Sequence, residues 1–270
     1  MTTFLFWNMN ARRELSSLTR LVAKHDVDIA MLAECNLDMV DVLRSLNSAS
    51  GGEYHYNKGN CEKITIYSRF SRGEIKPVLE DHRMTIRRLR PATGGDLLLA
   101  VVHLRSKLHQ TSSSQTLAAT EIARSVATAE KKAGHARTVL VGDLNMHPFE
   151  DGVVGASGLH AVMDRKIAAK RQRTVEGREH AFFYNPMWSM LGDASQGPPG
   201  TYYEWRSEQI AYFWHMFDQV LLRPDLLASF DNADLQILTS DGNSSLLTAA
   251  GTPDLTTTSD HLPLLFKLRS

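Results

Sequence analysis

The chain has few cysteines, no net charge and no long apolar segment. Its 270 residues include two cysteines, Cys35 and Cys61, which excludes a disulfide framework and predicts reduced thiols in a cytoplasmic protein. Thirty Lys and Arg residues balance thirty Asp and Glu residues, so a general attraction to polyanions is excluded. Binding of nucleic acid would therefore need a local basic surface.

Segments for export or membrane insertion are also lacking. The amino terminus has no basic region followed by a long apolar stretch and a small-residue cleavage site. The longest apolar run, at residues 97–102, is far shorter than the about 20 residues of a membrane-spanning helix. We expect a soluble, cytoplasmic protein without a membrane partner, and the sequence indicates no particular protein partner.

The composition is that of a globular protein, with 43% hydrophobic and 22% charged residues. Because there is no fixed-period repeat, low-complexity tract or clear linker, we expect one domain over residues 1–270. Short apolar runs predict strands at residues 4–7, 29–33, 64–67, 97–103, 138–141, 217–222 and 264–268. Apolar stripes at helical spacing predict helices within residues 15–22, 39–46 and 118–129.

Two further segments have a mixed apolar and basic pattern. Residues 81–90 alternate apolar side chains with arginines and end at a break in residues 91–95, which predicts an exposed hairpin. Residues 159–173 carry apolar side chains at helical spacing and predict a helix with a basic far end.

Four oxygen-bearing side chains lie at the probable carboxyl ends of strands or close to one: Glu34, Asp143, Asn145 and Asp260. Sites in open α/β sheets lie at this edge. Carboxylate and amide oxygens are also the ligands that hard divalent cations prefer. Each residue alone is equally compatible with a turn or a helix cap. The four together predict a divalent-metal phosphodiesterase.

Two histidines and one further acid complete the candidate site. His103 ends the run 97–103, on the edge expected for Asp143, and its alternative is a purely structural role. His261 follows Asp260 directly, so the two side chains converge only if this stretch is a loop, which Pro263 favours. Asp218 begins another strand and can orient the His261 imidazole, unless it merely caps that strand.

Seven short motifs together resemble those of one family. In chain order they are Trp7-Asn8-Met9-Asn10, Leu32-Ala33-Glu34, Ile66-Tyr67-Ser68-Arg69-Phe70, Val102-His103-Leu104, Gly142-Asp143-Leu144-Asn145, Asp218-Gln219-Val220-Leu221 and Ser259-Asp260-His261-Leu262-Pro263. This order resembles the endonuclease/exonuclease/phosphatase superfamily, which includes pancreatic deoxyribonuclease, apurinic endonucleases, bacterial sphingomyelinases and inositol-polyphosphate 5-phosphatases. The resemblance runs from residue 4 to residue 268.

The resemblance implies an α/β (α+β) fold. This is a four-layer sandwich in which two mainly antiparallel β-sheets pack face to face, with helices on both outer sides and the site at one end. It implies metal binding by Asn8, Glu34 and Asp260, the cation being Mg²⁺ or alternatively Mn²⁺. It also implies catalytic roles: Asp143 and Asn145 act on the attacking water, His261 held by Asp218 contacts the scissile phosphate, and His103 stabilises phosphoryl or leaving oxygens.

Two departures narrow the branch of the superfamily. Apurinic endonucleases place an acid where this chain has Asn10, and a tyrosine motif where it has His103. The motif with His103 resembles the corresponding motif of the deoxyribonuclease, sphingomyelinase and 5-phosphatase branches. Abasic-site repair is therefore a less favoured function.

Candidate substrate contacts are Lys107, Arg165, Arg171 and Tyr184. Lys107 lies four residues after His103, and basic residues 165–173 precede an aromatic group at 182–184, as in grooves that pair phosphates and stack bases. A solvated basic face beside core aromatics is the alternative. No long exposed apolar hairpin for entering lipid is evident.

These observations favour a nuclease that hydrolyses DNA, RNA or a nucleotide phosphodiester. A phosphatase acting on an inositol or nucleotide phosphate is the alternative enzyme. A catalytically silent binding protein of the same fold is the non-enzyme alternative.

Overall fold

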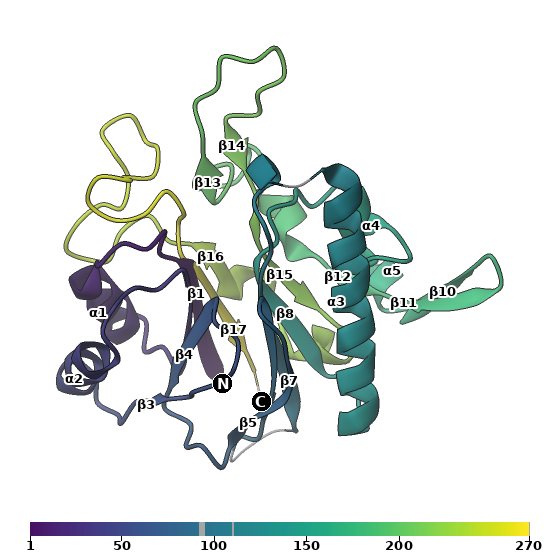
Figure 1. Ribbon diagram of the computed structural model, residues 1–270, viewed down its shortest axis with the longest axis horizontal. Coiled ribbons are helices and arrows are strands. Elements are labelled where there is room, and N and C mark those ends of the chain that lie inside the picture. Colours follow the sequence, from purple (N-terminus) through teal and green to yellow (C-terminus); the bar gives the residue numbers. More distant parts are fainter. Residues whose placement is uncertain (92–94, 110, 270) are drawn as a thin grey trace.

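Two β-sheets pack face to face, and helices cover their outer sides (Figure 1). The computed structural model describes residues 1–91, 95–109 and 111–269. Within them the first sheet has the strand order β16(Leu235–Ile237), β17(Leu264–Leu268), β1(Thr2–Asn8), β2(Ile29–Ala33), β4(Ile64–Ser68), β3(His55–Tyr56). The second has the order β5(Ile75–Glu80), β6(Met84–Leu89), β7(Leu97–His103), β8(Thr138–Asp143), β15(Asp218–Leu222), β12(Phe183–Tyr184), β9(Ala161–Val162).

Most neighbouring strands in both sheets are antiparallel. The parallel pairs are β1 with β2, β7 with β8, and β9 with β12. The expected sandwich of two mainly antiparallel sheets is therefore confirmed.

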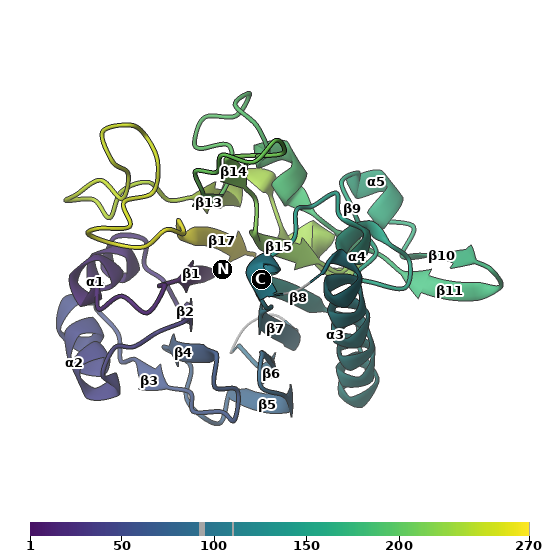
Figure 2. The same cartoon turned by 45° about the horizontal axis from the view of Figure 1, so that its top comes forward.

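The helices lie outside the two sheets (Figures 1 and 2). The helices α1(Leu15–Lys24) and α2(Met39–Ala49) cover the first sheet, and the long α3(Ser112–Ala133) covers the second. Caps set their ends: the Asp38 carboxylate accepts from backbone N–H groups at the start of α2, and Gly134 ends α3 in the left-handed conformation with φ 77°.

Alternating strand side chains fill three apolar layers. Phe4 of β1 points between the sheets and stacks on Phe266 with ring centroids 4.7 Å apart, whereas the next residue, Leu5, packs under α1 and α2. On β7, Leu99 faces the other sheet and Leu98 faces α3. Both faces of these strands are buried, which explains their continuous apolar runs.

Gly142 allows the ends of β7 and β8 to meet. A side chain there would place its Cβ 1.9 Å from the backbone oxygen of Val102, and φ at this residue is 153°. Such a contact is impossible for any other residue without a backbone shift. The close approach sets His103 opposite Asp143 in the parallel register.

Two of the segment predictions differ from the structure. Residues 84–89 form β6, which pairs antiparallel with its chain neighbours β5 and β7 as in a hairpin but is largely buried, so the expected exposure is wrong. Its Arg87 is buried because it forms an ion pair of 2.7 Å with Glu80. Residues 92–94 of the expected break lie outside the described residues.

The expected helix at 159–173 is also absent. This stretch contains strand β9, the short helix α5(Arg165–Ala168) and the start of β10(Gln172–Val175). His160 and Arg171 have positive φ values of 51° and 74°, which interrupt a helix on both sides.

The remaining elements are short. They are the ribbon of β10 with β11(Arg178–Ala181), the ribbon of β13(Tyr202–Tyr203) with β14(Trp214–His215), the helix α4(Asp151–Val154), and the 3₁₀ helices η1(Lys107–His109), η2(Pro186–Met190), η3(Pro224–Ser229) and η4(Asn232–Asp234). None of the helices in the described part of the chain is long and apolar enough to traverse a membrane.

Candidate active site

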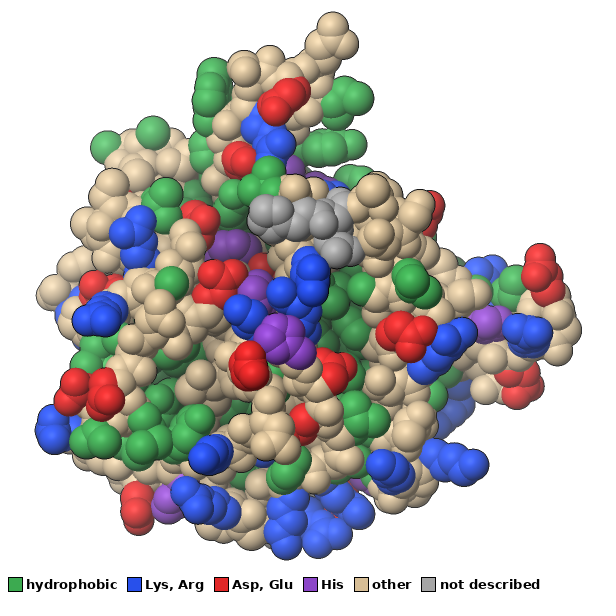
Figure 3. Space-filling view, in the orientation of Figure 1, with side chains coloured by type: hydrophobic (Ala, Val, Ile, Leu, Met, Phe, Trp, Pro, Cys, Tyr) green, Lys and Arg blue, Asp and Glu red, His purple; other side chains and the backbone are tan. Residues whose placement is uncertain are grey.

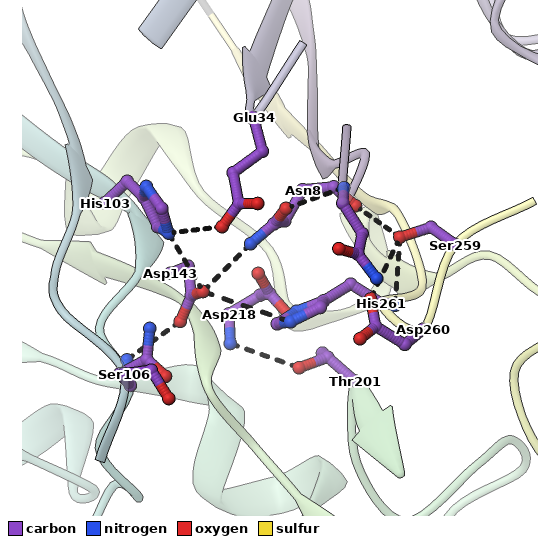
Figure 4. A network of polar contacts seen from close by, with 12 residues as sticks. Asn8, Glu34, His103, Ser106, Asp143, Thr201, Asp218, Ser259, Asp260 and His261 are labelled. Atoms are coloured by element: carbon purple, nitrogen blue, oxygen red, sulfur yellow. Dashed lines mark hydrogen bonds and ion pairs between the residues drawn. The ribbon is translucent and has the colours of Figure 1, made fainter. Parts of the chain in front are cut away.

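Strand ends from both sheets bring the predicted polar residues together (Figure 4). Asn8 ends β1, Glu34 follows β2, His103 and Asp143 end β7 and β8, and Asp218 begins the antiparallel β15. A cavity of about 600 Å³ opens at this edge. Its lining includes seven of the eight predicted catalytic and metal-binding residues, Asn8, Glu34, His103, Asp143, Asn145, Asp260 and His261, and the eighth, Asp218, lies behind His261.

Asp143 lies at the floor of this cavity and is 1% exposed. The side-chain amide of Asn8 donates to its Oδ2 at 3.0 Å, and the backbone N–H of Asn145 donates to its Oδ1 at 2.8 Å. Burial raises the pKa of Asp143, and the positive charge of His261 opposes that rise. A carboxylate held in this way is a stronger proton acceptor than one in water.

His261 and Asp218 form a buried, hydrogen-bonded pair. The His261 Nδ1 lies 2.7 Å from the Asp218 Oδ2, and Asp218 is fully buried. Burial disfavours the imidazolium, but the charge and hydrogen bond of Asp218, with the charges of Asp143 and Asp260, raise the pKa of His261 to about 10. The opposite ring nitrogen, Nε2, lies 4.0 Å from Asp143 Oδ2. His261 therefore presents a positively charged N–H to the cavity at neutral pH.

The loop that carries His261 is fixed to β1. The Ser259 hydroxyl donates to the backbone oxygen of Asn8 at 2.8 Å, and the Trp7 indole donates to the backbone oxygen of His261 at 2.9 Å. Residues 259–263 precede β17 and form only an isolated bridge with Tyr202. The loop geometry that Pro263 favours thus lets both Asp260 and His261 reach the cavity.

His103 and Glu34 face each other on the other side of Asp143. The His103 Nε2 lies 3.1 Å from Glu34 Oε1 and 3.7 Å from Asp143 Oδ2. Since carboxylates only accept, this nitrogen carries the proton. The hydrogen bond from His103 lowers the pKa of Glu34, although burial opposes the shift. Glu34 has φ 48°, a strained conformation of the kind that collects at functional sites.

The donor set around Glu34 fits a hard divalent cation. The Glu34 side chain is 37% exposed and lies on the cavity together with Asn8 and Asp260, which offer amide and carboxylate oxygens. Asp143, Asp218 and His261 also bring ligand atoms within 4.8 Å of one another. We favour the Glu34 side, because His261 Nδ1 already pairs with Asp218 and its charge would repel a cation.

The four candidate substrate contacts divide into two groups. Lys107 lines the cavity and forms an ion pair with Glu150. Arg165, Arg171 and Tyr184 do not line it: Arg165 donates to the backbone oxygens of Leu227 and Phe230, Arg171 pairs with Asp225, and the buried Tyr184 donates to Asn232 at 3.0 Å. These contacts hold η3 and η4 against the second sheet, so the three residues are engaged within the fold.

Tyr202 and His215, which line the cavity, and His147 beside them belong to no sequence motif. Tyr202 pairs with His261 in an isolated bridge, with the two rings 4.7 Å apart. The His147 Nε2 lies 3.0 Å from His215 Nδ1. Burial lowers the pKa of His147 to about 3 and that of His215 to about 4, so both rings are neutral at pH 7. The sequence has many aromatic residues before Asp218, but their spacing does not indicate that these three positions belong to the site.

Comparisons with known proteins agree with this architecture. A solved endonuclease/exonuclease/phosphatase family protein from Leptotrichia buccalis is 13% identical with a TM-score of 0.60, both chains being covered completely. An AP endonuclease from Archaeoglobus fulgidus is 13% identical with a TM-score of 0.58 at the same coverage. A 3′ phosphatase, NExo, from Neisseria bound to a product DNA hairpin is 17% identical with a TM-score of 0.56, again with complete coverage of both chains.

These identities are low and establish a shared fold. The search of curated proteins returned no match. The family model described as Endonuclease/Exonuclease/phosphatase family matches residues 5–261, which include every residue of the candidate site. The chain belongs to the endonuclease/exonuclease/phosphatase family.

Proposed function

We propose that the protein is a nuclease, a Mg²⁺-dependent phosphodiesterase in which Mn²⁺ can replace Mg²⁺. Members of the family hydrolyse phosphoesters. One observation carries the proposal for this chain: Asp143, His261 and Glu34, which are far apart in the sequence, converge on a single cavity. Water activation, phosphoryl binding and cation binding are thus available at one place.

The buried Asp143 is the proton acceptor for the attacking water. Asn8 and the Asn145 backbone hold both of its oxygens, which fixes its orientation before substrate arrives. The Asn145 side chain donates to the backbone oxygen of Leu104 at 3.1 Å and keeps this loop in position. Proton transfer to Asp143 accompanies attack on phosphorus, and the bond to the leaving oxygen breaks.

Two imidazoles bind the oxygens that gain negative charge. His261, oriented by Asp218, donates from Nε2 to a phosphoryl oxygen. His103 donates from Nε2 to a second phosphoryl oxygen or to the leaving oxygen. A divalent cation held by Glu34, with Asn8 and Asp260, supplies further positive charge for this purpose when bound.

Nucleic acid is the proposed substrate class. Two of the structural neighbours are a DNA-bound 3′ phosphatase and an AP endonuclease, which makes DNA a reasonable first substrate. The cavity also carries Lys63, Arg83 and Arg105 on its rim, a local basic surface on a chain with no net charge. We propose that residues 1–270 act as one domain and, since both cysteines are free thiols, that they work in the reducing cytoplasm.

A substrate panel tests the proposal. Purified protein is incubated with single-stranded DNA, duplex DNA, RNA, inositol phosphates and nucleotide monophosphates, with Mg²⁺, with Mn²⁺ and with excess chelator. We expect cleavage of a polynucleotide that requires the cation and stops in chelator. Phosphate release from monoesters alone would replace the nuclease by a phosphatase, and no turnover of any compound would favour a silent binding protein.

A further inference from the structure

A projecting arm stands beside the cavity. It consists of β13, β14 and their connection at residues 204–213, and it rises clear of the rest of the molecule (Figure 1). Trp205 is 74% exposed, Ile210 78% and Tyr212 58%. Ile210, Tyr212 and Phe213 also line the cavity, so the arm is one of its walls. The arm is not the long apolar hairpin for entering lipid that the sequence lacks, because its connection also carries Glu204, Arg206 and Glu208.

The rings of the arm make two kinds of contact, one within the arm and one with the body of the protein. Trp205 and Phe213 lie with ring centroids 5.5 Å apart, and Tyr212 packs on the neutral His147 with centroids 5.1 Å apart. Phe213 has φ 60°, a left-handed conformation that is unfavourable for an aromatic residue. Strain of this kind persists where a side chain must be held in a particular place.

A second wall of the cavity is cationic and consists of Lys63, Arg83 and Arg105. Among the described residues no carboxylate lies within ion-pair distance of these three, and Arg83 Nε is buried without a hydrogen-bond partner. Figure 3 shows Lys and Arg side chains grouped at the centre of this face, below the arm with its hydrophobic sides. On the arm itself, Arg206 is neutralised by Glu204 at 2.7 Å and Glu208 at 3.7 Å.

We propose that the arm stacks on an unpaired nucleobase beside the scissile phosphodiester, while Lys63, Arg83 and Arg105 bind the neighbouring phosphates. The substrate class is thus a single-stranded nucleic acid, or an unpaired segment of one, and the inference rests on the proposed nuclease function. Flat rings and cations without a carboxylate partner, both on the lining of one cavity, match the two parts of a nucleotide. A paired base has no free face beside its backbone for such stacking.

The charges on the arm argue against the alternative that it enters a lipid surface. Glu204, Arg206 and Glu208 lie in the same connection as Trp205 and Ile210. Insertion of the rings into lipid would carry these charges toward the hydrocarbon, at a high cost. A polyanion with exposed bases can contact both walls, because its bases stack on the rings of the arm and its phosphates bind the cationic wall.

Binding measurements in excess chelator test the arm separately from hydrolysis. The probes are a fluorescent single-stranded DNA, the same chain built from base-free deoxyribose units, and the duplex. Stacking predicts that the wild-type protein binds the strand with bases about ten-fold more tightly than the base-free strand. Tyr212→Ala removes most of that preference and leaves base-free binding unchanged, whereas Tyr212→Phe retains the preference because the ring remains. Leu117→Ala, an equally exposed change on α3, is the matched control.

Several outcomes would overturn the inference. They are equal affinity of the wild-type protein for strands with and without bases, a preference for the duplex, or a preference unaffected by Tyr212→Ala. Arm-dependent binding to phosphatidylcholine vesicles without a nucleobase preference would assign the arm to lipid. Thermal unfolding of each variant verifies its fold. A preserved nucleobase preference together with no Mg²⁺-dependent cleavage would contradict the proposed function and leave the binding role of the arm intact.

Discussion

Asp143→Asn is expected to lower kcat for phosphodiester cleavage by between about 10² and 10⁴-fold, the range for a lost general base. The amide is nearly isosteric with the carboxylate, so the buried position remains filled. It cannot accept the proton from water. The measurement is kcat at saturating Mg²⁺ on the best substrate of the panel.

The control for this variant is Asp193→Asn, an equivalent change at an exposed aspartate outside the cavity lining. Its kcat should equal that of the wild type. The unfolding midpoint of Asp193→Asn should equal that of the wild type. Asp143→Asn should still unfold cooperatively but at a lower midpoint, because its amide keeps the volume yet accepts from only one of the two N–H donors, Asn8 and Asn145. If Asp143→Asn turned over at the wild-type rate, the assignment of the proton acceptor would be wrong.

His261→Gln is expected to lower kcat by about 10² to 10³-fold, since it removes one donor to the phosphoryl oxygens. Asp218→Asn should give a smaller loss, because the imidazole stays in place but its Nδ1 hydrogen bond and its charge are weakened. We expect Asp218 to act through His261, whose Nδ1 it contacts. The double variant should therefore be no slower than His261→Gln alone.

The measurement is kcat for the wild type, both single variants and the double variant. Losses that multiply in the double variant would indicate that Asp218 has a function independent of His261. This result would contradict the positioning role that the 2.7 Å contact suggests.

The strands could be predicted well from the sequence because both of their faces are buried. Residues 97–103 read as one apolar run because Leu98 packs under α3 while Leu99 faces the other sheet. Residues 159–173 misled the prediction, since apolar spacing alone does not reveal the positive φ at His160 and Arg171 that prevents a helix. The exposure expected for residues 81–90 was also wrong, because the charge of Arg87 is compensated by Glu80 on another strand, a pairing that the local sequence does not show.

Some residues of the candidate site could be predicted from the sequence and others could not. Residues in short motifs at strand ends, such as Glu34 and Asp143, could be identified, because the sheet edge and a preceding apolar run indicate where they lie. Lys63 and Arg83 reach the cavity through strand register, and Tyr202 through an isolated bridge to His261. These are long-range pairings that no local pattern in a single sequence encodes.

We propose that Glu34, Asn8 and Asp260 hold one divalent cation next to Asp143, and the nuclease function depends on this cation. Anomalous diffraction at the manganese edge, from crystals soaked in Mn²⁺, tests it most directly. We predict a peak within direct coordination distance of the Glu34 carboxylate, which Glu34→Gln weakens or removes. A peak between Asp218 and His261, with none at Glu34, would contradict the account.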